Sequence, residues 1–130
     1  MEQDEVLRVF RQARQAARDK IVEDVARTQD PINRARANFA GVFQAVEAIN
    51  GDLEPEAAPI EVRFEKPDLK VANAPVKWTF RAHRPGYAAL EVRCQAQGQH
   101  LMIQQQDEWM ATDVDGAADL IARSFGPFFA

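Results

Sequence analysis

The sequence is poor in the residues from which metal and catalytic centres are usually built. Its 130 residues include one cysteine and two histidines, and neither His83 nor His100 has a cysteine or second histidine at a spacing typical of zinc sites. The single Cys94 leaves no partner for an intramolecular disulfide. We therefore expect no metal site and no cofactor, and we expect Cys94 to pack in the core, where free cysteines are common.

Clustered glycines and long apolar runs are missing as well. The six glycines form no phosphate-binding loop, so the sequence does not support nucleotide binding. No segment approaches the run of about 18 apolar residues that a membrane span requires, and residues 1–5 lack the basic start of a signal peptide. These features predict a cytoplasmic protein outside the membrane, and they favour a non-catalytic protein over an enzyme.

The charges that are present balance over the first part of the chain. Residues 1–50 carry eight basic and eight acidic side chains, so the net charge of -4 arises entirely in the remainder. Hydrophobic residues make up 46% and charged residues 28% of the chain, as in ordinary globular proteins. This composition predicts one folded domain over residues 1–130.

Residues 1–50 have the periodicity of helices. Apolar residues recur at steps of three and four, which places them on one helical face. Asp30 followed by Pro31 resembles a helix start, so a boundary or sharp kink is predicted there, and the second helix is predicted to stop at Asn50 and Gly51. The apolar positions of the first helix are Val6, Phe10, Ala13, Ala17, Ile21 and Val25.

Residues 60–112 alternate between apolar and polar side chains, with turn-forming residues between the runs, which predicts an antiparallel meander. Residues 51–59 form the connector before it. Asp113 or Asp115 is expected to cap a last helix over residues 113–126, stopped by Gly126 and Pro127 and followed by a tail, residues 127–130. The predicted fold is α+β: two N-terminal helices, four to five antiparallel strands, and a C-terminal helix packed on the sheet.

The helical part offers more apolar surface than so small a sheet would cover. Val6 and Phe10 belong to that surface, and Phe128 and Phe129 follow the last predicted helix. These phenylalanines either fold back onto their own sheet or enter a groove on another molecule. The leading hypothesis is an interaction or assembly protein that self-associates, with a homodimer favoured, or that holds a protein partner.

A row of arginines supports an alternative. Arg8, Arg11, Arg14 and Arg18 follow one another at steps of three, three and four along the first predicted helix. Asp4 is placed to pair with Arg8, whereas the other three have no acidic neighbour three or four positions away. The row is either an ordinary solvated helix face or a contact surface for an anionic partner such as nucleic acid.

A third hypothesis concerns a small-molecule pocket between sheet and helix. Its wall would consist of aromatic side chains that the meander brings together. The same residues suit an ordinary core better than a pocket wall. They are Trp78, Phe80, Tyr87 and Trp109.

Overall fold

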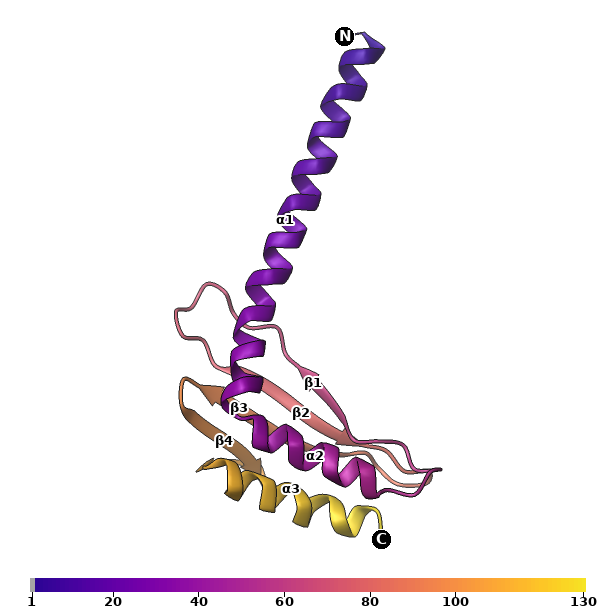
Figure 1. The fold of residues 1–130 in the computed structure, drawn as a ribbon, viewed down its shortest axis with the longest axis vertical. Helices are drawn as coiled ribbons and strands as arrows, with labels where there is room; N and C mark the ends of the chain where they lie inside the picture. The colour runs from indigo at the N-terminus through magenta and orange to yellow at the C-terminus, as the bar shows by residue number, and fades with distance from the viewer. Residues whose placement is uncertain (1) are drawn as a thin grey trace.

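The computed structural model describes residues 2–130 and has the α+β architecture predicted from the sequence (Figure 1). Two helices precede five strands, and a third helix follows them. Their bounds are α1 Gln3–Asn38, α2 Ala40–Asp52, β1 Glu61–Phe64, β2 Val76–Ala82, β3 Leu90–Gln97, β4 His100–Gln105, β5 Glu108–Thr112 and α3 Val114–Phe128.

The five strands form a single antiparallel meander in the order β1-β2-β3-β4-β5. Trp78 of β2 pairs with Cys94 of β3, and Cys94 pairs with Ile103 of β4, so inward side chains lie side by side across the sheet. The β4–β5 hairpin closes through Gln106 and Asp107, which both have positive φ. A two-residue hairpin loop with positive φ at both positions matches the right-handed twist of the strands.

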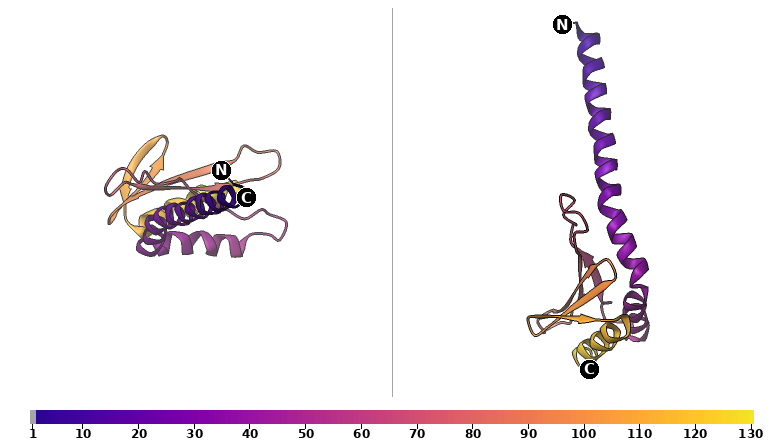
Figure 2. Two further views of the ribbon diagram at one scale, coloured as in Figure 1. Left: turned by 90° about the horizontal axis from the view of Figure 1, so that it is seen from above. Right: turned by 90° about the vertical axis from the view of Figure 1, so that its left-hand side faces the viewer.

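Helices α2 and α3 lie side by side on one face of the sheet (Figures 1 and 2). At their crossing, Gly41 of α2 faces Val114 of α3 so closely that a Cβ on Gly41 would lie 2.5 Å from Val114 Cγ1. The start of α3 is capped by Asp113, whose Oδ1 accepts a hydrogen bond of 2.7 Å from the Gly116 amide. The predicted cap is therefore confirmed.

The core between the sheet and its two helices is built from inward strand residues and one face of each helix. Trp78, Phe80, Cys94, Ile121 and Phe125 are among its fully buried side chains. Burial raises the pKa of the Cys94 thiol to about 12, because the thiolate would lose its hydration there. Cys94 is thus the core residue that the alternation of β3 predicts.

The opposite face of the sheet is polar. Glu91 lies between two arginines, with its carboxylate 3.6 Å from Arg81 Nε and 3.4 Å from a terminal nitrogen of Arg93. All three side chains remain partly exposed, so these ion pairs contribute little to stability. These three side chains need no cover from another element, because each is partly in contact with solvent.

The predicted break at Asp30 and Pro31 is wrong. Helix α1 runs without interruption through Pro31 to Asn38, and the chain turns at Phe39. Pro31 removes only the hydrogen bond that would reach the Arg27 carbonyl. Gln29 donates a side-chain hydrogen bond of 2.9 Å to Asn33 across the proline, and the burial of Ile32 one residue later anchors the helix below it.

Two helix ends also differ from the sequence prediction. Helix α2 continues past Asn50 to Asp52, because neither Asn50 nor Gly51 adopts the positive φ of a helix stop. The Asn50 side chain exchanges two hydrogen bonds with the backbone of Ile60, 2.7 and 3.1 Å long. Helix α3 continues past Gly126 to Phe128, with Pro127 in its last turn. The Phe129 amide closes that turn on the Phe125 carbonyl at 3.2 Å.

Candidate interaction surface

The part of α1 that precedes Pro31 extends away from the rest of the molecule (Figures 1 and 2). Residues 2–27 are all exposed, and burial in α1 starts with Ile32 and Ala35. We call residues 2–30 the projecting helix and residues 31–130 the body. Most helices in proteins are stabilised by packing of an apolar face, and the apolar face of the projecting helix is open to solvent.

One apolar stripe runs along the whole of α1, through both regions. From Val6 to Phe39 its members follow at steps of three or four that average about 3.7 residues, close to the 3.6 residues of one helical turn. The stripe therefore stays on one side of the helix. Its members are Val6, Phe10, Ala13, Ala17, Ile21, Val25, Thr28, Ile32, Ala35 and Phe39.

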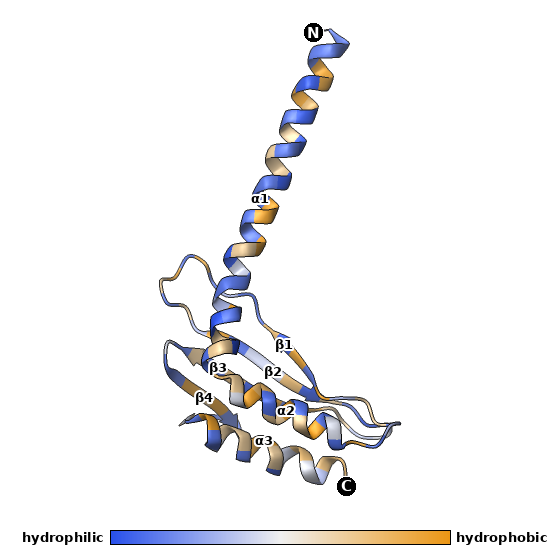
Figure 3. Cartoon of the chain, in the orientation of Figure 1, coloured by the Kyte–Doolittle hydropathy of each residue, from blue (hydrophilic) through white to orange (hydrophobic). Residues whose placement is uncertain are grey.

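Only the lower end of this stripe is covered. Ile32 and Phe39 are 8% and 5% exposed because they pack in the core of the body, whereas Phe10 and Ile21 are 55% and 62% exposed. Bands of apolar residues along the projecting helix are visible in Figure 3. Further apolar side chains widen the bare surface near both of its ends: Leu7, Val9 and Val22.

The structure gathers Val6 and Phe10 on this surface, but it places the two terminal phenylalanines elsewhere. Phe128 and Phe129 are half-buried and pack against the core of their own chain. Arg84 fixes this end, with Nη1 donating to the carbonyl of Phe128 at 3.0 Å and to that of Ala130 at 2.7 Å. Of the two alternatives drawn from the sequence, the structure shows the phenylalanines folded back.

The arginine row lies on the projecting helix beside the stripe. Among residues 2–130, no carboxylate lies within ion-pair distance of Arg8, Arg11, Arg14 or Arg18, so the predicted pair of Arg8 with Asp4 is not formed. Arg14 instead places its guanidinium 5.2 Å from the ring centroid of Phe10. The row is thus accessible along its length.

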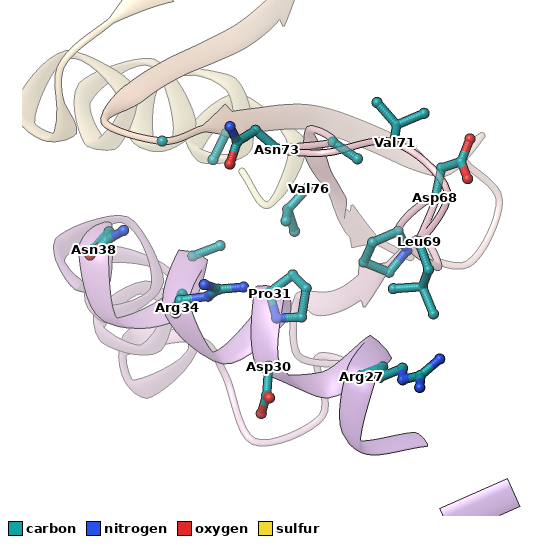
Figure 4. Close-up of a pocket in the computed structure, with 15 residues that line it drawn as sticks. Arg27, Asp30, Pro31, Arg34, Asn38, Asp68, Leu69, Val71, Asn73 and Val76 are labelled. Carbon is teal, nitrogen blue, oxygen red and sulfur yellow. The ribbon is translucent and has the colours of Figure 1, made fainter. Parts of the chain in front are cut away.

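A groove of about 590 Å³ lies where α1 meets the body. One wall is α1 itself, with Arg27, Pro31 and Arg34, and the other is the loop between β1 and β2, with Leu69 and Val71 (Figure 4). Leu69 and Val71 are exposed, so this wall adds apolar surface beside the stripe. No feature of the sequence predicted the groove, because it depends on α1 continuing through Pro31.

The four aromatic residues of the pocket hypothesis lie in three separate places. Trp78 and Phe80 are buried in the core, where the ring of Phe43 packs against both. Tyr87 is 61% exposed under the guanidinium of Arg84, and Trp109 lies exposed on an edge strand. None of the four lines the groove at the base of α1.

Other kinds of site find no support in the described part of the chain. Within residues 2–130, no three histidine, cysteine, aspartate or glutamate side chains come together as metal ligands would. No helix among these residues combines the length and the apolar character needed to cross a bilayer. Comparison of the chain with protein-family models, curated proteins and solved structures found no match.

Proposed function

We propose that this chain is a non-catalytic interaction protein that self-associates, as a homodimer, through the apolar stripe of its projecting helix. The observation that carries the proposal is the bare upper stripe: the side of α1 that is sealed in the core at Ile32 is open to solvent at Phe10 and Ile21. Exposed apolar surfaces of this extent are typical of protein interfaces. A cytoplasmic location is part of the proposal, because a single buried thiol suits a reducing compartment.

Sedimentation velocity over a wide range of concentration tests this proposal. The unmodified chain is expected to be dimeric at micromolar concentration, and Phe10→Asp, which puts a charge among the bulky residues of the bare stripe, is expected to be monomeric. Gln12→Asp is the matched control: it adds the same charge to the opposite side of the same helix and should leave the dimer intact. A chain that remains monomeric throughout contradicts the proposal.

The arginine row supports a second candidate function, the binding of a polyanion such as nucleic acid. Four accessible guanidinium groups without carboxylate partners are suited to phosphate contacts. Replacement of Arg11, Arg14 and Arg18 by alanine should abolish binding to a fluorescent nucleic acid duplex, and binding by the unmodified chain should weaken steeply with salt. An absence of binding at low salt rejects this candidate.

A further inference from the structure

The projecting helix has an arrangement of side chains that decides how a second copy would lie on it. Bulky apolar residues lie toward its two ends, Val6 and Phe10 at one end and Ile21 and Val25 at the other. Between them the stripe contains only small residues, Ala13 and Ala17 among them. The pattern is therefore nearly symmetric about a midpoint between residues 15 and 16.

We infer that two copies pair through α1 in antiparallel orientation about this midpoint, an inference that rests on the proposed self-association. In this register Val6 comes level with Val25 of the second copy and Phe10 with Ile21. Ala13 of one copy comes within one residue of Ala17 of the other, which permits close approach of the helices at the centre. Every bulky residue of the bare stripe then has an apolar partner, as an isologous two-fold interface requires.

The position of the body opposes the parallel alternative. Because the stripe stays on one side of α1, the body that covers Ile32 lies on the same side as the bare residues above it. The loop between β1 and β2 rises along that side to the level of Arg27 (Figures 2 and 4). In a parallel pair, both bodies would need the space between the two helices at the same level, whereas an antiparallel pair separates them to opposite ends.

The length of the bare stripe also fits an antiparallel copy. In the register above, Glu2 of the second copy comes level with Gln29, close to Pro31, at which the body begins. The paired segment is about 43 Å long at 1.5 Å per residue, and a helix is 10–12 Å wide. The two copies together would bury on the order of 1,000 Å², the lower limit of specific interfaces.

The charges of the projecting helix favour the same orientation. Residues 2–5 contain three acidic groups, residues 8–18 contain four arginines and no acid, and residues 19–24 carry three acidic groups and one lysine. A parallel pair would place each of these charged segments beside the same segment of the second copy, so that like charges meet. The antiparallel register brings Arg8 level with Glu23 of the second copy and Arg27 within one residue of its Glu5. Like charges meet only nearer the midpoint, where Arg11 comes level with Lys20 and Arg14 comes within one residue of Arg18.

Spin labels on introduced cysteines distinguish the two orientations in the intact chain. Cys94 is buried and its pKa is raised, so we expect it to take up no label. The introduced cysteine of Gln15→Cys or of Gln29→Cys is then the single labelled position in each chain. Gln15 lies next to the midpoint, so its two labels come level with each other both in a parallel pair and in the antiparallel register above, and their distance is short because it reflects only the width of the helix pair. Gln29 should give about 40 Å in the antiparallel register, because the two labels are then some 27 residues apart along the pair.

The outcomes separate this inference from the proposed function. A short distance at Gln15 with a long one at Gln29 supports antiparallel pairing. Short distances at both positions overturn it and leave self-association intact. If light scattering shows the labelled chains and the unmodified chain to be monomeric, the proposed function itself fails.

Charge reversal gives a second, independent test. Arg27→Glu is expected to weaken the dimer several-fold, and Glu5→Arg in the same chain should restore the dissociation constant to within about twofold. Within one helix these residues lie about 33 Å apart, so only an antiparallel partner brings them together. Arg27 also pairs with Glu23 of its own helix, so circular dichroism of both variants must show unchanged helix content. A double variant whose dissociation constant stays as weak as that of Arg27→Glu contradicts the antiparallel register.

Discussion

The body and the projecting helix are built with the same apolar stripe and differ in what covers it. Below Pro31 the stripe enters a core in which Val42, Phe80 and Phe125 are fully buried. Above Pro31 the same helix projects from the body, and only the loop between β1 and β2 rises beside it, as far as Arg27 among the described residues. The comparison teaches that the apolar residues of the projecting helix cannot serve the stability of the single chain, whereas those of the body must, and this difference can be measured.

The sharpest test of the comparison is to remove one phenylalanine from each region. Phe80→Ala should lower the free energy of unfolding by about 3–5 kcal/mol, because it leaves a cavity in a closely packed core. Phe10→Ala should change the unfolding of the body by less than about 0.5 kcal/mol while weakening self-association. Urea denaturation at a concentration where the chain is monomeric measures both. A large loss of stability for Phe10→Ala would show that the helix folds back onto the body.

Thiol chemistry gives the next largest contrast. Cys94 should resist alkylation at pH 8, whereas a cysteine introduced at the exposed Gln15 should react at once. Because the folded-state pKa of Cys94 is raised to about 12 from an ordinary value of 9.0, folding favours the protonated thiol. The stability from this group is therefore complete below pH 9 and is lost as the pH rises from 9 to 12. Mass spectrometry after timed alkylation checks the reactivity, and rapid labelling of Cys94 would contradict its burial.

The cap of α3 is a smaller contribution within the body. Asp113→Ala should cost about 1 kcal/mol, since it removes the acceptor of the Gly116 amide at the helix start. Asp115→Ala, in the same turn but without a capping hydrogen bond in the structure, is the matched control and should cost less. Thermal denaturation compares the two variants, and equal losses would show that charge near the helix start matters more than the hydrogen bond.

The elements found from the sequence are those whose signal is local. Alternation in residues 76–82 and 90–94 reports which side chains face the core, and the hydrogen bond of Asp113 lies within one turn. The continuous α1 was missed because Asp30 and Pro31 have the composition of a helix start, while the side-chain hydrogen bond from Gln29 to Asn33 and the burial of Ile32 hold the helix together across them.

The candidate surface was predictable only in part, for a related reason. The stripe from Val6 to Val25 is visible in the sequence, but its exposure depends on where the body stands along α1. The groove beside Arg34 and Leu69 depends on a loop that approaches the helix from more than 30 residues away. The half-burial of Phe128 similarly depends on Arg84, a residue that no local pattern connects with the C-terminal helix.

The smallest expected effect concerns ion pairs, which occur in both regions. Arg123 pairs with Asp119 in α3 of the body, and Arg27 pairs with Glu23 in the projecting helix, each one helical turn apart with both side chains mostly exposed. Asp119→Asn should change the free energy of unfolding by no more than about 0.5 kcal/mol, because solvent screens an exposed pair even where the helix below it is packed on a core. Urea denaturation at low and high salt measures the effect. A change well above 1 kcal/mol would mean that the packing of α3 on the core strengthens surface ion pairs. The two regions would then differ in the strength of their ion pairs as well as in the burial of their apolar residues.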